Sequence, residues 1–390
     1  MLRQVAQWVV PHMDMSNGGF WIIDDTGFPK KGIHSVGVTR QYCGALGKQD
    51  NCQVAVSVSL ACEEGSLPVA WQLYLPRAWA EDTQRRRKAG VPEEVEFATK
   101  PQIALQQLRH LLDQGAPKHC VLADAGYGID YDFRRNLSDM GLLYVVGITS
   151  AVVVWPPNVT PLPPKRCKGM GRPPVMPRRT ATRQPVSVKE LALSLPGSAW
   201  QDISWREGTN AQLTGHFAAA RVRCAGGMWS VHVYCPSSGC SLNGLPDRQS
   251  QRSTIFHAAG EHGIERSGTN PHMRWRIKRD YQDLKQDMGL GHYEGRGWRG
   301  FHHHASMSIA AYGFLMAQRL KAGGSVGGKK TSSNAKCLPF PKITSLGAAQ
   351  RAQRHIPDSI TSLRPRISIA LVSELGFCPH CNWVSARLRL

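Results

Sequence analysis

The chain has 390 residues, with 48 Lys or Arg against 28 Asp or Glu, so its formal net charge is +20. A hydrophobic fraction of 42% is enough to form a core and excludes a wholly disordered chain. The longest apolar stretch, 142–155, is shorter than the roughly 20 residues that span a bilayer, so we expect no membrane protein. The large positive charge indicates a polyanionic partner, with nucleic acid the first choice and a ribosome-like structural role the alternative.

The cysteines do not predict a disulfide framework. There are eleven of them, an odd number, and the N-terminal residues lack the cleavage site of a signal peptide. Cys378 and Cys381 form one CxxC pair, which supplies two zinc ligands, or three if His380 adds a cramped third. A surface turn is therefore favoured over structural zinc.

The hydrophobic pattern of the first 150 residues predicts the first part of an α/β domain. Four consecutive apolar residues, 20–23, predict a strand buried on both faces that ends at Asp24 and Asp25. The predicted elements are, in chain order, a helix (2–13), three strands (20–23, 52–62, 67–75), a helix (100–114), a strand (120–124), a helix (131–140) and a strand (142–148).

The rest of the chain is more irregular. It divides into a Pro-rich basic linker (151–190), a partly irregular β-rich insertion (191–270), the last helices of the domain (271–320) and a basic C-terminal tail (321–390). Within the insertion, strands are predicted at 215–224 and 228–235, and 236–270 lacks a strand pattern. Helices are predicted at 273–290 and 305–320.

Two acids carry most of the functional argument, because each lies at the end of a predicted buried strand. A carboxylate in that position is costly unless it is solvated, paired or bound to metal. Asp25 and Asp124, in a strongly basic chain, are typical of the two-metal site of enzymes that act on phosphodiesters, and Mg²⁺ suits such ligands. Alternatively, Asp25 forms a turn and Asp124 is an ordinary cap at the end of its strand.

Several long motifs resemble one group of bacterial insertion-sequence transposases, the DDE endonuclease type. The motifs are WIIDDTGFPKKG (21–32), SVGV (35–38), RQYCG (40–44), VLADAGYG (121–128) and HYEGRGWRGFHHH (292–304). The resemblance covers roughly 1–150, 271–320 and, more weakly, 349–371. It implies an RNase H-like mixed sheet flanked by helices, with a β-rich insertion and a basic loop.

The resemblance also implies an activity, which is DNA cleavage and strand transfer at the terminal inverted repeats of the element. Asp25 matches the first metal-binding acid, with Asp24 beside it, and Asp124 matches the second. Two Mg²⁺ or Mn²⁺ ions are expected as cofactors. The implied partners are double-stranded DNA, as inverted-repeat ends and target, and a second copy of the chain in a homodimeric synaptic complex, with no membrane. The implied location is the nucleoid in the bacterial cytoplasm.

The third acid is where this chain departs from the related transposases, whose last helix resembles R-W-x-I-E-x-x-[FY]-x-x-x-K. The matching stretch here is RWRIKRDYQDLK (274–285), so Lys278 stands in place of the glutamate. A charged lysine has no lone pair with which to bind Mg²⁺. The chain is then an impaired relic, or Glu294 serves instead, or the register is wrong. Asp280 and Asp283 are weaker substitutes because they point away from the 278 face.

Two further features favour decay. The chain begins about 24 residues before the first matched metal-binding aspartate, whereas the relatives carry a further N-terminal region, and 236–270 reads as out of register. The alternative function is therefore a non-catalytic DNA-binding relic. A structural nucleic-acid-binding protein without transposase ancestry is a third hypothesis.

The DNA contacts expected from the resemblance are basic or aromatic residues. They are Lys30, Lys31, Arg274, Tyr281, Lys285, Arg296 and Arg299. The alternative for the charged ones is a solvated basic face. Trp298 is expected to pack in the core rather than stack on a base, and we do not expect His302–His304 to bind a metal, because adjacent histidines on a helix diverge.

Overall fold

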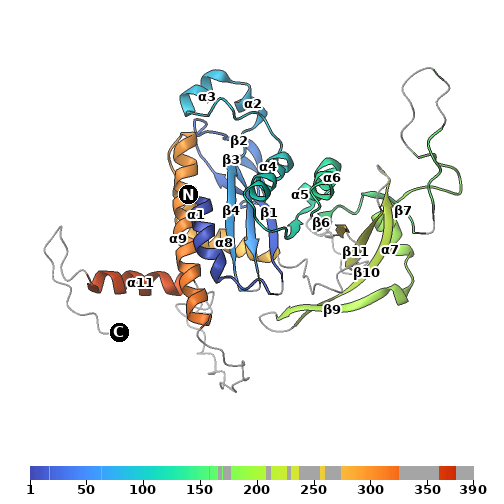
Figure 1. Cartoon of the computed structure of the whole chain (residues 1–390). Coiled ribbons are helices and arrows are strands. Elements are labelled where there is room, and N and C mark those ends of the chain that lie inside the picture. Colours follow the sequence, from blue (N-terminus) through green and yellow to red (C-terminus); the bar gives the residue numbers. More distant parts are fainter. Residues whose placement is uncertain are drawn as a thin grey trace, which may run out of the picture.

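The computed structural model describes residues 1–16, 18–62, 64–157, 159–165, 169, 177–207, 212–225, 230–236, 255–259, 274–324 and 360–374. These residues form a mixed sheet with helices on both faces (Figure 1). No helix in these ranges is long and apolar enough to cross a membrane. Cys378, His380 and Cys381, the possible zinc ligands, lie outside the described residues.

Five strands form the central part of the sheet. They are β1 (Phe20–Pro29), β3 (Lys48–Ala61), β4 (Ser66–Leu73), β5 (Cys120–Ala123) and β6 (Tyr144–Ile148), in the spatial order β4-β3-β1-β5-β6. β3 is antiparallel to β1 and β4, whereas β5 is parallel to β1 and β6. This order with these directions is RNase H-like, so the predicted fold class is confirmed.

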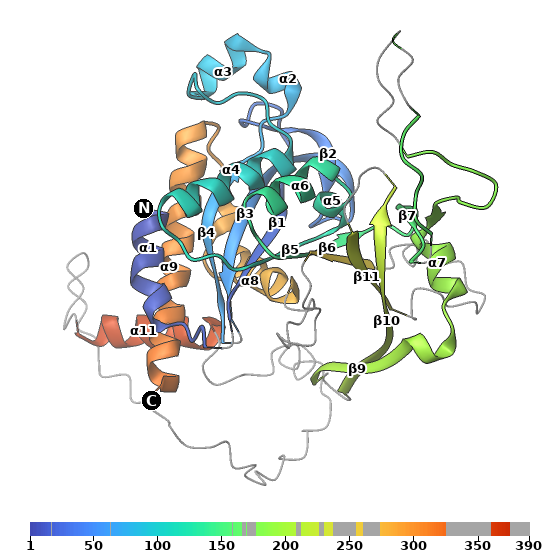
Figure 2. The ribbon, with the colours of Figure 1, turned by 45° about the vertical axis from the view of Figure 1, so that its right-hand side comes forward.

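Helices cover both faces of this sheet (Figure 2). One face carries α4 (Lys100–Asp113), α5 (Ala125–Gly128) and α6 (Tyr131–Asp139), and the other carries α1 (Leu2–Val9), α8 (Trp275–Gln286) and α9 (Trp298–Gly324). The core strands are apolar on both faces for this reason, and Trp21, Ile22 and Ile23 are at most 2% exposed. The smaller helices α2 (Arg77–Ala80) and α3 (Thr83–Ala89) lie together above the central strands in Figure 1.

A second group of strands extends the sheet beyond β6. These are β7 (Val153–Trp155), β8 (Val186–Ser187), β9 (Trp200–Glu207), β10 (Gln212–Cys224), β11 (Ser230–Pro236) and β12 (Ile255–Ala259), with α7 (Val188–Ser194) packed beside them. β12 lies between β6 and β11 and is antiparallel to both. The strands predicted near 215–224 and 228–235 are therefore confirmed, and β9 was not predicted.

Other elements also differ from the sequence-based expectations. β1 continues to Pro29 instead of ending at Ile23, because β3 pairs with it over its whole length. β2 (Thr39–Cys43) was missed, since its polar sequence has no strand periodicity. The expectation that 236–270 holds no strand was wrong, because β12 lies there, which removes one argument for decay. α9 begins at Trp298 rather than Ala305.

The region expected as a basic tail also contains structure. α11 (Ile360–Glu374) contacts α9, and its first residue, Ile360, is buried in the main core.

Candidate active site at the carboxyl ends of the parallel strands

β1 extends beyond the end of its parallel neighbour β5, and the site lies where β5 ends. β5 pairs with β1 only as far as Leu122 opposite Ile22, and β5 then ends at Ala123. Asp24 and Asp124 each follow that last pair by two residues, so they stand at the same level on neighbouring chains. Residues two apart on an extended chain share a face, so the two carboxylates project to the same side. In an open sheet with parallel strands, ligands bind at this carboxyl edge.

The pleat of β1 sends its two adjacent aspartates to opposite faces. Asp24 lies opposite Ser57 of β3, and the Ser57 hydroxyl is 2.6 Å from the hydroxyl of Tyr281 in α8. Asp25 lies on the other face, where its carboxylate accepts a 2.7 Å bond from Lys100 at the start of α4. The residue that shares Arg274 with Asp124 is therefore Asp24, whereas the resemblance matched Asp25 to the first metal-binding acid, with Asp24 beside it.

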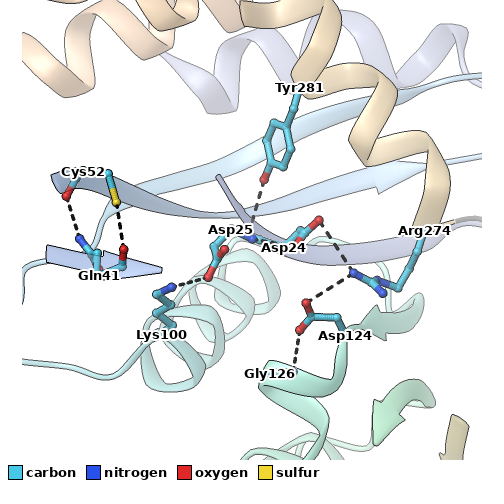
Figure 3. A network of polar contacts seen from close by, with 9 residues as sticks. All are labelled: Asp24, Asp25, Gln41, Cys52, Lys100, Asp124, Gly126, Arg274 and Tyr281. Atoms are coloured by element: carbon cyan, nitrogen blue, oxygen red, sulfur yellow. Dashed lines mark hydrogen bonds and ion pairs between the residues drawn. The ribbon is translucent and has the colours of Figure 1, made fainter. Parts of the chain in front are cut away.

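Arg274 joins the two carboxylates on the α8 side (Figure 3). Its guanidinium lies 3.9 Å from a carboxylate oxygen of Asp24 and 3.8 Å from one of Asp124. The Arg274 Nε is buried and has no hydrogen-bond partner among the described residues. Arg274, predicted as a DNA contact, is thus engaged within the protein, where it neutralises part of the charge of the cluster.

The position of Asp124 follows from its local sequence, Asp-Ala-Gly-Tyr-Gly. Its side chain accepts a 2.9 Å bond from the Gly126 backbone N–H and so caps α5. α5 then packs directly on β6, since a Cβ at Gly128 would overlap the carbonyl oxygen of Gly147. Asp124 was predicted alternatively as a strand-end cap; in the structure it caps the helix that follows the strand, and its other carboxylate oxygen faces Arg274.

Burial dominates the electrostatics of Asp24. It raises the pKa of this carboxyl from 3.8 to about 7, although the nearby Arg274 charge opposes the shift, and the charges of Asp124 and Asp25 add to it. A carboxyl in this state binds a proton readily at neutral pH unless a cation replaces the proton.

A buried tyrosine lies beside the same acids and was not predicted from the sequence. The Tyr127 hydroxyl in α5 has no hydrogen-bond partner among the described residues. Burial, followed by the charges of Asp25, Asp24 and Asp124, raises its pKa well above 10. The Tyr-Gly element after Asp124 was the only sequence signal for it.

Two residues of α8 that were predicted to contact DNA instead bind β1. The Lys285 ammonium donates a 2.7 Å bond to the Gly27 carbonyl and lies 4.8 Å from the centre of the Phe28 ring. Tyr281 is 7% exposed, and its hydroxyl lies 3.5 Å from the Asp24 carbonyl. Their contacts fix α8 against the strand that carries Asp24.

Lys278 lies on the side of α8 that faces β1. At about 100° per residue, it is about 40° from Arg274 and about 20° from Lys285, both of which contact β1. Its side chain is exposed, at the edge of this face. Asp280 and Asp283 lie elsewhere, since Asp280 accepts bonds from Ser66 and Tyr312 and Asp283 pairs with Arg279.

The structure does not bring Glu294 to the two aspartates. Glu294 is exposed, and its charge acts on Lys30, whose ammonium donates to the carbonyl of the adjacent Tyr293. Lys30 follows the end of β1, five residues or about 17 Å beyond Asp25. Within the described ranges, no three His, Cys, Asp or Glu side chains are grouped so as to hold a metal ion.

The other predicted DNA contacts lie after β1 and near the start of α9, and these two segments contact each other. Arg296, Arg299 and Lys31 are exposed, and Lys30 is half-buried. The prediction that Trp298 packs in the core is confirmed, because it is 8% exposed and contacts the His302 ring.

Known proteins similar to this chain indicate its family. Residues 1–212 match the model of the DDE superfamily endonucleases. Over 130 residues the chain is 38% identical to a probable transposase for insertion sequence element IS701 from Microchaete diplosiphon. That match covers 33% of this chain and spans only 31% of the length of the relative.

A solved structure of the piggyBac transposase synaptic complex with hairpin DNA aligns with 94% of this chain and 66% of its own, at 10% identity and a TM-score of 0.36. A TM-score this low does not establish a shared fold. The match of the family model, by contrast, extends over more than half of the sequence, and paired aspartates stand at the carboxyl edge of the sheet. The chain belongs to the DDE superfamily of endonucleases.

Proposed function

We propose that this protein is a DNA transposase that cleaves DNA and transfers strands at the inverted-repeat ends of an insertion sequence. The observation that carries the proposal is the pair Asp24 and Asp124, held 3.9 and 3.8 Å from one guanidinium at the carboxyl edge of an RNase H-like sheet. The relative named as an insertion-sequence transposase supports the choice of substrate. The partners in this proposal are double-stranded DNA and a second copy of the chain, acting on the nucleoid in a bacterial cytoplasm.

The residues at this edge fit a divalent cation, Mg²⁺ or Mn²⁺. Magnesium sites often use only one or two carboxylates, with water and substrate phosphate completing the shell. Asp24 and Asp124 supply these carboxylates, and the unpartnered Tyr127 hydroxyl would hydrogen-bond to a water of that shell. When bound, the metal supplies an activated water and a positive charge at the leaving oxygen. A second ion, with Asp25 in its shell, is the arrangement that the family resemblance implies.

The protein's own cations already balance part of this acidic charge. Arg274 contacts Asp24 and Asp124, and Lys100 contacts Asp25. A metal ion therefore competes with Arg274 for the same carboxylates. Lys278, at the position of the family's third acid, adds a further positive charge where the family has a ligand.

Arg274→Met tests this competition. The substitution keeps much of the side-chain length and removes the charge, so we expect lower stability without metal and a larger rise in melting temperature on adding Mn²⁺ than the natural chain shows. Arg279→Met, on the same helix but paired with Asp283 at 3.1 Å, is the matched control and should leave the Mn²⁺ effect unchanged. Equal Mn²⁺ shifts in all three proteins would show that Arg274 does not compete with the metal.

A second candidate function, a DNA-binding protein that does not cut, is favoured by Lys278 alone. A lysine beside the metal-binding acids repels the metal and replaces a ligand. In that case the fold and DNA binding persist while cleavage is lost.

Lys278→Glu separates the two candidates. We expect a labelled inverted-repeat duplex with Mg²⁺ or Mn²⁺ to be cut at least about 10²-fold faster by this variant than by the natural chain, because a carboxylate replaces a cation at the site. Lys278→Gln is the control, since it removes the charge without adding a ligand. Cutting by Lys278→Glu alone identifies an impaired enzyme with an intact scaffold, whereas equal cutting by all three shows that another acid serves. If none of them cuts although all bind, the transposase proposal fails for this chain.

A further inference from the structure

A basic pocket lies away from the aspartates, and none of Asp24, Asp25 and Asp124 lines it. It is an open hollow of about 520 Å³. Its walls come from the segment after β1, the beginnings of β2 and β3, and α3, and the residues lining it are Ile33, His34, Val38, Thr39, Arg40, Asn51 and Arg85. Neither its charges nor its shape are used by the site described above.

The lining carries cations and no acid. Arg40 and His34 are exposed, and Arg85 is half-buried. The acid Asp50 interacts electrostatically with Arg40, but it does not line the pocket and is paired with Lys48 at 3.2 Å. A pocket with this lining attracts an anion.

Arg85 is fixed in direction before any ligand arrives. Its guanidinium lies 3.8 Å from the centre of the Trp79 ring and donates a 3.2 Å bond to the Ile33 carbonyl. Trp79 is itself 2% exposed and donates a 2.7 Å bond to the Val38 carbonyl. A preorganised guanidinium loses little entropy on binding, and its planar set of donors matches a phosphate.

The wall opposite α3 is also held in place. The Asn51 amide donates bonds of 2.7 and 2.9 Å to the carbonyls of Lys30 and Gly32, and the Val36 N–H donates a 3.0 Å bond to the Arg296 carbonyl. The segment that carries Ile33 and His34 is thus anchored to β3 and to the chain before α9. Ile33 is 65% exposed at the pocket, so an apolar surface lies beside the cations. A ligand with a phosphate next to an apolar sugar face fits both features.

We propose that this pocket binds a backbone phosphate of duplex DNA, with Arg40 and Arg85 as its main contacts and Ile33 against the neighbouring deoxyribose. The inference deepens the proposed function and rests on it. Asn51 lies five residues along β3 from Val56, the partner of Asp25, which is about 17 Å.

The test measures the salt dependence of duplex binding. A fluorescein-labelled duplex of about 30 base pairs is titrated with the full chain at several salt concentrations, and the slope of log K against log[salt] is compared between variants. For Arg40→Gln combined with Arg85→Gln, we expect the slope to become shallower by about 1 and the affinity at about 0.1 M salt to fall roughly 5- to 10-fold, which is the effect of one lost phosphate contact. Arg85→Lys keeps the charge but loses the planar set of donors, so its affinity should lie between that of the natural chain and that of the double variant.

The matched control is Arg87→Gln combined with Lys88→Gln, which removes the same charge from exposed positions of α3 outside the pocket. Its slope should change by less than half as much. Equal losses in both double variants would overturn the pocket assignment in favour of long-range attraction, and so would an unchanged slope for the pocket variant. If the natural chain shows no salt-dependent duplex binding at all, the proposed function fails with it. Melting temperatures within about 3 °C of the natural chain confirm that each variant is folded. If Arg85→Gln does not fold, Arg40→Gln alone, at an exposed position, replaces the double variant in the test.

Discussion

Asp24→Asn and Asp124→Asn should each abolish metal-dependent cleavage, slowing it by at least about 10³-fold. Each substitution removes a charged ligand from a site where the bound metal stabilises the transition state by several kcal/mol, and about 4 kcal/mol corresponds to 10³ in rate. The measurement is single-turnover cutting of a labelled inverted-repeat duplex, in the Lys278→Glu background if the natural chain does not cut. Loss of the Mn²⁺-induced rise in melting temperature is an independent readout.

Asp25→Asn is the internal comparison, because Asp25 is the neighbouring residue on the opposite face. Its contact with Lys100 at 2.7 Å turns it away from Arg274 and Asp124, so we expect it to slow cleavage less than Asp24→Asn does. If Asp25→Asn removes cleavage while Asp24→Asn retains it, the assignment from strand register is wrong and the family resemblance gives the correct acid.

The same Asp24→Asn substitution should stabilise the metal-free protein at neutral pH. Burial raises the pKa of Asp24 from 3.8 to about 7, so the folded state holds this proton more tightly than the unfolded state does. The stability of the chain therefore falls as the pH rises from about 4 to about 7, by an amount on the order of a few kcal/mol. Asparagine cannot ionise, so the melting temperature of the variant should exceed that of the natural chain at about pH 8 and not at about pH 4. A lower melting temperature for the variant at the higher pH would contradict this explanation.

Asp280→Ala should cost about 3–5 kcal/mol of stability, the largest structural effect expected outside the site. Asp280 is 5% exposed and accepts hydrogen bonds from Ser66 of β4 and from Tyr312 of α9, the latter at 2.8 Å. It therefore joins three elements that meet on one face of the sheet. Its removal leaves two buried hydroxyl groups without this acceptor, and unsatisfied buried polar groups are costly. The measurement is equilibrium unfolding in urea.

Asp139→Ala is the matched control for Asp280→Ala. Asp139 pairs with Arg135 on the surface of α6 at 3.8 Å, with both side chains more than half exposed, and such pairs contribute about 0.3–0.5 kcal/mol. A double-mutant cycle with Tyr312→Phe then isolates the bond to Tyr312. A cost below about 1 kcal/mol for Asp280→Ala would show that the three elements are held together mainly by apolar packing.

Much of the fold could be predicted from the sequence because local patterns determine it. The apolar runs of β1, β5 and β6 are typical of strands covered on both faces, and the period of α4 and α8 identifies their buried sides. The positions of Asp24 and Asp124 after apolar residues placed both acids near one edge of the sheet. Among the elements that were missed, β2 and β12 are short, and partners elsewhere in the chain stabilise them.

The assignment of side chains to the site required the folded chain. The alternation of side chains along a strand predicts that Asp24 and Asp25 face opposite sides of the sheet. Which of the two faces α8 is determined by the pairing of β1 with β5 and by the packing of α8. The sequence made Glu294 a reasonable candidate for the third catalytic acid. In the folded chain its charge acts on Lys30, just after the end of β1. Tyr281 and Lys285 were predicted as DNA contacts from the resemblance, and burial against β1 gives them internal partners.

The family, the core strands and the acids that matter are therefore encoded locally, in motifs and hydrophobic patterns of the amino-acid sequence. Local sequence patterns do not encode how those acids pair or which cations contact them. Asp24 meets Asp124 through Arg274, and Asp25 meets Lys100. These contacts join residues about 75 to 250 positions apart, and no local pattern encodes which distant side chains meet.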